Sequence, residues 1–99
     1  MGFQKYSAKK DPDSVVDYGR NWTDWLGDTD TITTSIWLIQ AEDEAIPSLV
    51  EDSNGYDATH TSVWLSGGAE GVVYQLTNRI TTVESRTEDR TGLLTVEHK

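Results

Sequence analysis

The sequence contains no cysteine, only two prolines, and no long run of apolar residues. Without cysteine, the chain can build neither a disulfide framework nor a thiolate metal site. No window approaches the roughly 20 apolar residues that a membrane-spanning helix needs, and the first residues lack the apolar run of a signal peptide. The N-myristoylation pattern also fails, because Tyr6 stands where Ser or Thr is required. We therefore expect assembly in a cytoplasm, without a membrane partner.

Basic residues are also scarce. The chain has 8 Lys and Arg against 17 Asp and Glu, which gives a formal net charge of -9. A field of this sign repels both the phosphate backbone of nucleic acids and anionic lipid. The charge balance therefore argues against a nucleic-acid partner.

What the sequence does contain is a succession of short segments rich in β-branched and aromatic residues. With 99 residues, 35% of them hydrophobic, the chain has the size of one domain. Turn-forming residues recur at the spacing of all-β domains, about 8 to 12 residues, and no segment has the period of a long helix. These features predict an all-β sandwich of about six or seven short antiparallel strands. The segments with strand character are 31–39, 46–50, 58–66, 72–82 and 93–97.

The order of side chains within these segments indicates how each strand lies. Apolar and polar residues alternate along 72–82, which predicts a central strand with one face on the core. Residues 31–39 alternate imperfectly, so either both faces are covered or a bulge shifts the register. Pro47 predicts that 46–50 is an edge strand, because proline cannot donate to a β-ladder. The connections are predicted as an acidic loop at 41–45, a turn cluster at 51–57 and a charged turn at 85–92.

The first residues of the chain are polar and differ from the strand-rich remainder. Within residues 1–13, Pro12 pushes Asp11 toward an extended conformation. We expect this segment to be an arm that is ordered only when it has a partner. The chain is thus divided into an N-terminal arm with a short helical turn at 1–30 and a β-sandwich at 31–99.

The sequence NWTDWLG at 21–27 predicts that helical turn. Asn21 is placed to cap its beginning and Gly27 to end it. Trp22 and Trp25 then lie on or near one face of the turn. Because they precede the sandwich, they are expected either to cover an open end of it or to dock on another subunit.

No segment carries a recognisable catalytic, metal or cofactor motif. His60 and His98 lie far apart in the sequence, and neither has a nucleophile motif nearby. The glycines of SGGAEG at 66–71 lack the order and the lysine of a phosphate-binding loop. The acidic and amide clusters do not follow an EF-hand pattern and are typical of turns. These clusters comprise Asp28, Asp30, Asp52, Asn54 and Asp57.

Four tryptophans in so small a domain raise a second hypothesis, a carbohydrate-binding module with exposed indole rings that stack on sugars. Trp37 and Trp64, however, lie inside segments rich in core residues. Packing between the two sheets is therefore the favoured role for both. An enzymatic function has the least support, because no nucleophile, base and orienting group converge in any segment.

The segment GVVYQL at 71–76 resembles the tyrosine corner of immunoglobulin-like domains. In such a corner, a tyrosine near the start of a late strand hydrogen-bonds to the backbone upstream. Tyr74 would occupy that position, and Gly67, Gly68 and Gly71 would let the chain turn between the sheets. The resemblance implies that the sandwich is immunoglobulin-like.

Longer blocks of the chain resemble a family of small tailed-bacteriophage proteins known as fiber-tail adaptors or minor virion proteins. The blocks are KDPDSVVDYGRNWTDWL, DTITTSIW and TSVWLSGGAEGVVYQLTNRITT, and the resemblance covers about residues 9–98. It implies a non-enzymatic virion component, assembled in the host cytoplasm, that forms a ring and joins the tail or neck tube to fibers or adjacent rings. Its expected partners are other virion proteins, and it needs no cofactor. The residues that would make the attachments are Asp11, Pro12, Tyr18, Trp22 and Trp25.

Overall fold

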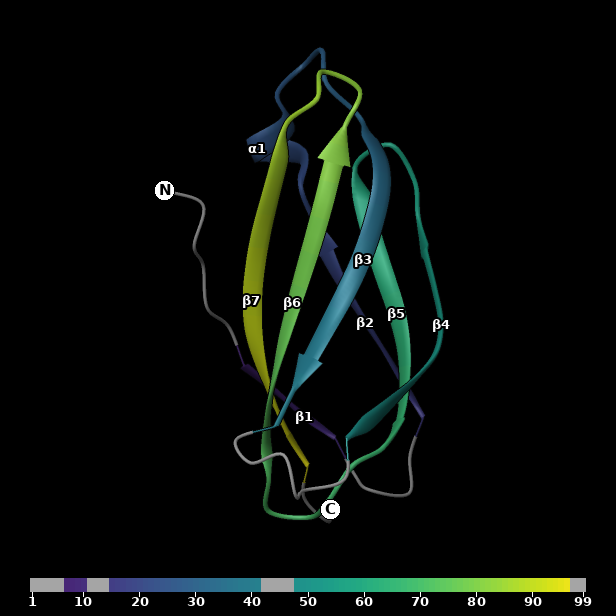
Figure 1. Ribbon diagram of the computed structural model, residues 1–99, viewed down its shortest axis with the longest axis vertical. Coiled ribbons are helices and arrows are strands. Elements are labelled where there is room, and N and C mark those ends of the chain that lie inside the picture. The colour runs from purple at the N-terminus through teal and green to yellow at the C-terminus, as the bar shows by residue number, and fades with distance from the viewer. Residues whose placement is uncertain (1–6, 11–14, 42–47, 97–99) are drawn as a thin grey trace.

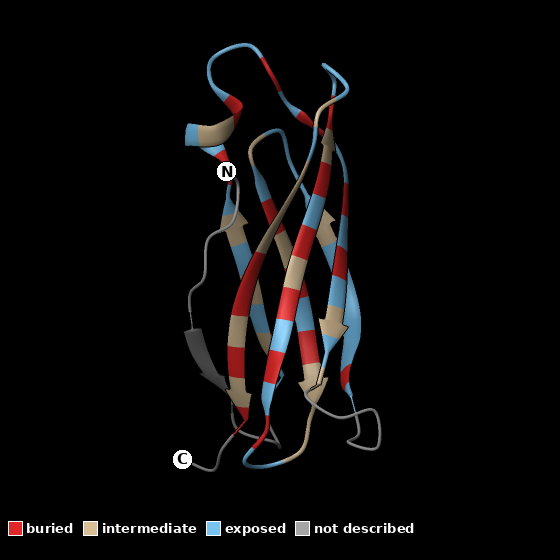
Figure 2. Ribbon diagram, turned by 60° about the vertical axis from the view of Figure 1, so that its left-hand side comes forward, coloured by how far each residue is buried: buried red, intermediate tan, exposed pale blue. Residues whose placement is uncertain are grey.

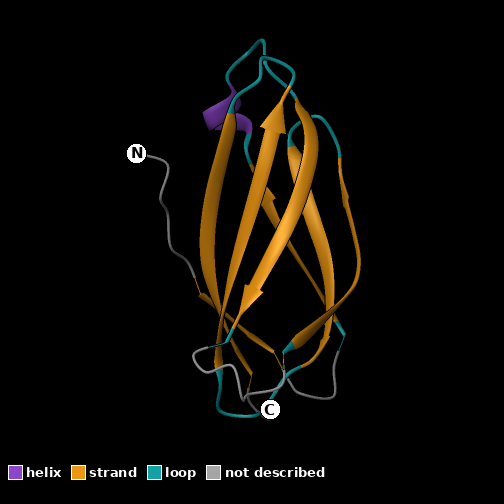
Figure 3. Ribbon diagram, in the orientation of Figure 1, coloured by secondary structure: helices purple, strands orange, loops and turns teal. Residues whose placement is uncertain are grey.

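The computed structural model describes residues 7–10, 15–41 and 48–96. The elements run in the order β1, β2, α1 and then β3 to β7 (Figures 1 and 3). Their bounds are β1 Ser7–Lys10, β2 Val16–Asn21, α1 Thr23–Leu26, β3 Ile32–Gln40, β4 Leu49–Tyr56, β5 His60–Gly67, β6 Val73–Thr82 and β7 Thr87–Val96. No helix in these ranges has the length and apolar character of a membrane span.

The strands form two sheets that pack face to face as a β-sandwich. One sheet has the order β1-β7-β6-β3 and the other the order β2-β5-β4. The sandwich is elongated, with extents of 42 × 23 × 20 Å, and α1 lies at one end of it (Figure 1). The predicted all-β sandwich is confirmed, with one departure from the expected antiparallel pattern, because β1 pairs with β7 in parallel.

The sandwich also includes strands that precede residue 31. Residues Ser7–Lys10 pair with β7, and Val16–Asn21 pair with β5 in antiparallel register. The proposed division at residue 30 therefore cuts through the sandwich, and part of the predicted arm belongs to a sheet. The segment VDYGRN escaped prediction because its inward positions include Arg20 and its outward positions include Gly19, so the apolar alternation is weak.

Two segments that were predicted as turns are strands. β4 continues through 51–56 with a register shift between Glu51 and Ser53, and β7 begins at Thr87. Their polar residues are compatible with strands because the neighbouring strands β5 and β6 satisfy the backbone groups. The actual turn between β4 and β5 is built by Asp57, whose carboxylate accepts hydrogen bonds from the backbone N–H groups of Thr59 and His60. The acidic loop and Pro47 lie outside the described residues.

The strand predictions for 31–39 and 72–82 are confirmed. β3 shifts register between Ile32 and Thr34, which is the bulge that its imperfect alternation allowed. β6 lies between β7 and β3, and its buried and exposed residues alternate along the strand (Figure 2). Its core-facing residues belong to two clusters: Leu76 packs in the larger one, and Ile80 packs near α1 in the smaller one.

The end of the sandwich away from α1 is closed by the β5–β6 turn. The buried Tyr74 hydroxyl accepts a 2.8 Å hydrogen bond from the backbone N–H of Ala69, which is the contact that a tyrosine corner makes. Gly68 has φ +95, and a Cβ there would lie 2.8 Å from Cδ2 of Leu49. Both the backbone conformation and the close approach therefore require glycine at this position.

Candidate functional site

The end of the sandwich that carries α1 brings together two tryptophans, Trp22 and Trp25, and two arginines, Arg86 and Arg90. Asn21 Oδ1 accepts a 2.9 Å hydrogen bond from the Thr23 backbone N–H at the start of the helical turn, and Gly27 follows its end with φ 76. The Trp22 and Trp25 rings meet edge to face with centroids 5.6 Å apart. The predicted helical turn is confirmed, together with the proximity of its two tryptophans.

Trp22 nevertheless cannot serve as a docking residue on the surface. Its side chain is 0% exposed and packs with Leu26, Ile32 and Ile80 in the smaller core cluster. The assignment of Trp22 to an interface is therefore corrected, because the indole fills the end of the sandwich. Trp25 packs against the same cluster but keeps part of its ring exposed.

A buried asparagine ties Trp22 to both sheets. Asn78 Oδ1 accepts hydrogen bonds from Trp22 Nε1 at 2.9 Å and from the Thr61 hydroxyl at 2.6 Å. Its amide nitrogen donates to Ser35 Oγ and to the Ile36 carbonyl, both at 3.0 Å. One side chain on β6 thus joins α1, β5 and β3, and it is 0% exposed. In a dry environment such a fully satisfied network holds its members in one arrangement.

An ion pair holds the loop after α1 against the β6–β7 turn. Arg86 Nε donates to Asp30 Oδ2 at 2.8 Å, and its Nη2 group donates to the Leu26 carbonyl. Asp30 is 3% exposed, and burial would raise the pKa of its carboxyl group. Hydrogen bonds from Thr82 and Arg86, and from two backbone N–H groups, outweigh burial and lower that pKa below its ordinary value. The carboxylate is therefore held in its charged form.

Two arginines near this end stack on the two tryptophans. The Arg86 guanidinium lies 4.2 Å from the centroid of the Trp25 ring, and the Arg90 guanidinium lies 4.4 Å from that of Trp22. Such cation–π contacts fix the planes of both guanidiniums. The arginines differ in their remaining contacts, because Arg86 also binds the Asp30 carboxylate.

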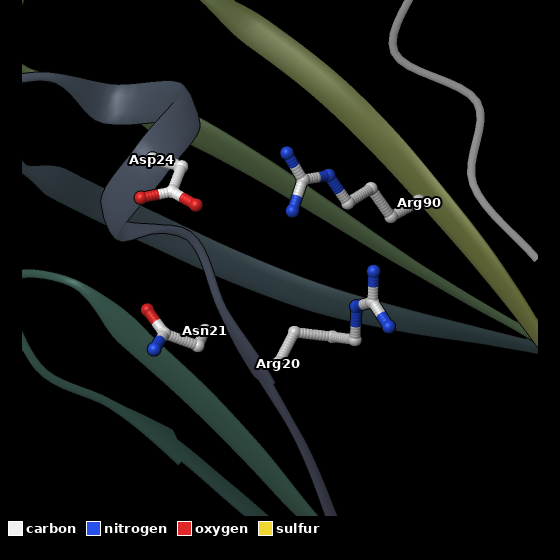
Figure 4. Close-up of a pocket in the computed structure, with 4 residues that line it drawn as sticks. All are labelled: Arg20, Asn21, Asp24 and Arg90. Atoms are coloured by element: carbon white, nitrogen blue, oxygen red, sulfur yellow. The ribbon is translucent and has the colours of Figure 1, made fainter. Parts of the chain in front are cut away.

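An open pocket of about 510 Å³ lies beside Arg90. Arg20 and Asn21 on β2, Asp24 on α1 and Arg90 on β7 line it, and the two guanidiniums extend into the space between these elements (Figure 4). A second, smaller pocket of about 290 Å³ opens near the far end of β3 and carries no charged lining residue. The pocket beside Arg90 is thus the charged one of the two.

Burial and a second cation both act on Arg90. Burial lowers the pKa of Arg90 and the nearby Arg20 guanidinium lowers it further, whereas Glu88 and Asp24 act in the opposite direction. The pKa of Arg90 is lowered overall, chiefly by burial. An opposite charge close to the guanidinium favours its charged form.

Trp64 lies on the outer face of the β2-β5-β4 sheet and is 45% exposed. Its predicted role in packing between the sheets is wrong, because its neighbours Val63 and Leu65 face the core instead. The prediction for Trp37 is correct, since this residue is buried and its ring lies 6.0 Å from that of Tyr18, edge to face.

The structure describes only some of the remaining predicted site residues. Asp11 and Pro12 lie outside the described residues, and the half-buried Tyr18 packs on the larger core cluster. His60 is exposed and contacts Thr59 and Asp57 within its own turn. Within the ranges that the structure describes, no group of three or more His, Asp or Glu residues is arranged to hold a metal ion.

The residues that sequence reasoning missed are Arg20, Asn78 and Arg90. Each has a polar side chain at an inward position of a strand, where an apolar residue would be expected. Asn78 has the same parity as Tyr74 and Leu76, and this interruption of the apolar face was the available signal. Arg90 had no such signal, because its strand was predicted as a turn.

Comparison with known proteins identifies the family. The family model "Podophage GP4 fiber-tail adaptor protein gp77" matches residues 10–95, which is most of the chain. No curated protein matches the sequence. The match confirms the resemblance drawn from the sequence blocks. The chain belongs to the podophage fiber-tail adaptor family.

Proposed function

We propose that this protein is a non-enzymatic structural component of a tailed-phage virion that links the tail or neck tube to peripheral fibers or to an adjacent ring. The observation that carries the proposal is the match of residues 10–95 to a fiber-tail adaptor family. The structure supports it with a rigid attachment end, in which Asn78 and the Asp30–Arg86 ion pair fix α1 on the sandwich. An adaptor that transmits force between two bodies benefits from such a pre-organised surface.

The sandwich that carries this surface is proposed to be immunoglobulin-like. In that fold, one sheet pairs the second, fifth and fourth strands of the chain, and the other pairs the third, sixth and seventh. The sheet β2-β5-β4 and the strands β7-β6-β3 follow the same pairing, whereas β1 departs from it by joining β7 and not the β2 sheet. The buried Trp37 on β3 and the Tyr74 hydroxyl bond near the start of β6 agree with this proposal.

The attachments are proposed to involve the segment around Asp11 and Pro12, together with Trp25. Trp25 is suitable because its ring is partly exposed while its position is fixed by Trp22 and Arg86. A rigid, partly exposed aromatic ring loses little conformational entropy on binding. Tyr18 is proposed to support the sheet from inside instead, because its ring packs on Trp37.

Several copies are proposed to form a closed ring in the tail or neck region, after assembly in the host cytoplasm. An interface that joins two different surfaces of one chain generates a ring when the rotation between copies closes. The edge strands β3 and β4 lie on one side of the sandwich, where they contact each other, and β1 and β2 form the opposite edges of the two sheets. A head-to-tail contact between these sides is compatible with a ring.

The experiment that tests the proposal uses particles assembled without this chain. Such particles are expected to lack fibers, and purified full-length chain added back is expected to bind them and restore fiber attachment. Fiber occupancy is counted by electron microscopy before and after addition. The double variant D11A/P12A tests the proposed attachment segment. After its fold has been verified, it is expected to restore fewer fibers than the wild type. Particles that carry a full set of fibers without the chain would contradict the adaptor role.

One observation favours a second function, a carbohydrate-binding module. The Trp64 ring is 45% exposed on the outer face of a sheet, with Asp17 and Ser53 beside it on the neighbouring strands. An indole flanked by hydrogen-bonding groups can stack on a sugar ring and orient its hydroxyls. Oligosaccharides that quench tryptophan fluorescence in the wild type but not in W64A would support this function. A glycan panel without effect would leave the adaptor function as the only candidate.

A further inference from the structure

The two stacked arginines differ in whether they hold a carboxylate. Arg86 lies over Trp25 and binds Asp30 through Nε, so its arrangement of ring, guanidinium and carboxylate is complete. Arg90 lies over Trp22 in the corresponding way, but its guanidinium makes no hydrogen bond to any described residue. A guanidinium carries five N–H donors in a planar fork that suits a carboxylate. The Arg90 arrangement is therefore missing its anion.

The surroundings of Arg90 are suited to receive that anion. The pocket of about 510 Å³ is large enough for a side-chain carboxylate together with part of its backbone. The Arg20 guanidinium enters it from β2, and Asn21 lines the pocket from the other side of this strand (Figure 4). Because Trp22 is fully buried and held by Asn78, the ring beneath Arg90 cannot move aside. The donors are thus positioned before any ligand arrives.

The chain does not supply a sufficient anion from its own described residues. Asp24 and Glu88 are close enough to raise the pKa of Arg90, yet burial and Arg20 keep that pKa lowered. Within the part of the chain that the structure describes, Arg90 therefore holds no carboxylate in the way that Arg86 holds Asp30.

We propose that this pocket binds a side-chain carboxylate from an acidic segment of a neighbouring virion protein, held between the guanidiniums of Arg90 and Arg20. Asn21 and Asp24 also line the pocket. The contact gives the adaptor an electrostatic attachment point that is specific despite the chain's net charge of -9. This inference rests on the proposed function, because it takes the partner to be another virion protein.

The first test measures binding of the purified full-length chain to particles assembled without it, at an ionic strength of about 0.15 M. R90Q is expected to weaken binding about tenfold or more, because it removes the charge and the fork. R90K keeps the charge without the fork and is expected to fall between R90Q and the wild type. D24N removes a competing carboxylate and is expected to bind as tightly as the wild type or a few-fold tighter.

The matched control is R79Q. Arg79 is an exposed arginine on β6 that already forms a bidentate pair with Asp89, with bonds of 2.8 Å and 2.9 Å. R79Q is therefore expected to bind like the wild type. Thermal unfolding of each variant verifies that it is folded. Wild-type binding that R90Q and R79Q both retain would overturn the inference, whereas absence of wild-type binding would count against the proposed function.

The second test does not depend on the particle. A capped Gly-Glu-Glu-Gly peptide is titrated into the full-length chain at millimolar concentration, and side-chain signals are followed by NMR. The Arg90 Nε–H and Trp22 Nε1–H signals are expected to shift and saturate, while those of Arg79 and Trp64 stay in place. A capped Gly-Gln-Gln-Gly peptide is expected to cause no shift. Equal effects of the two peptides, or no effect at Arg90, would overturn the proposal.

Discussion

Trp22 and Asn78 lie 56 residues apart in the sequence, and the indole Nε1 of one donates a 2.9 Å hydrogen bond to Oδ1 of the other in the interior of the sandwich. This bond connects the short helix to the central strand β6. The stacked Arg90 guanidinium lies over the same indole. The position of the charged pocket therefore depends on a polar contact in the core.

Loss of the Asn78 side-chain amide should destabilise the fold strongly. N78L is close in volume but leaves Trp22 Nε1 and the Thr61 hydroxyl without their acceptor. Each buried group left unsatisfied costs roughly 1–3 kcal/mol, so we expect the free energy of unfolding to fall by about 3 kcal/mol or more. Urea denaturation measures the change. The exposed N54L is the control, expected to stay within about 0.5 kcal/mol; an equally small effect of N78L would contradict the network's role.

The Asp30–Arg86 ion pair should make the free energy of unfolding depend on pH in the acidic range. The pKa of Asp30 is lowered in the folded state, so the ionised carboxylate stabilises the fold above its ordinary pKa of about 3.9. That contribution is lost as the pH falls through the lower, folded-state value. Melting temperatures from pH 7 down to pH 2.5 are expected to show a gap between wild type and D30N that closes only at the acid end. D28N changes an exposed neighbour and should melt at the same temperatures as the wild type. A difference in melting temperature between D30N and the wild type that stays constant with pH would show that ionisation of Asp30 is not linked to folding.

Alanine substitutions at the two glycines Gly68 and Gly71 of the β5–β6 turn should differ in their effect on stability. Gly68 and Gly71 both have positive φ, +95 and +84, but a Cβ at Gly71 meets nothing within 4 Å. G71A should therefore cost only the conformational strain, about 1–2 kcal/mol. G68A should cost about 1–3 kcal/mol more, because its methyl group would also overlap Leu49 and Val96. Equal losses in the free energy of unfolding for the two variants would show that the close approach is not limiting.

The hydroxyl group of Tyr74 should stabilise the same turn. Y74F removes the acceptor of the 2.8 Å bond from the Ala69 backbone N–H, and we expect a loss of about 1–2 kcal/mol with the fold retained. Hydrogen exchange of the Ala69 amide should accelerate in parallel. Y56F, which removes an exposed bond from Tyr56 to the Thr33 carbonyl, is the comparison and should cost less. A Y74F variant as stable as the wild type would remove the tyrosine corner from the account.

Sequence patterns were sufficient to assign a strand where one of its faces is apolar. Residues 72–82 and 31–39 were correctly assigned to strands because β-branched and aromatic residues mark their inward positions. The register shift between Ile32 and Thr34 is one of the two alternatives that the pattern of 31–39 left open. The patterns failed for β7, whose first residues are charged. Those residues are stable in a strand because β6 supplies partners across the sheet, such as Arg79 for Asp89, and this pairing is tertiary information.

The candidate site was predictable only in its location. The cluster NWTDWLG indicated that the region around the helical turn matters, but the pattern could not separate the buried Trp22 from the partly exposed Trp25. The pocket brings Arg20 on β2 next to Arg90 on β7, two residues separated by most of the chain. Such a pair becomes visible only when the two sheets are stacked.

A reconstruction of the assembled virion at side-chain detail is the decisive test of the adaptor function. We expect copies of this sandwich in a ring at the fiber–tail junction, with an Asp or Glu of a neighbouring protein within hydrogen-bonding distance of the Arg90 guanidinium. A fiber–tail junction that is complete without density for this chain would contradict the central claim.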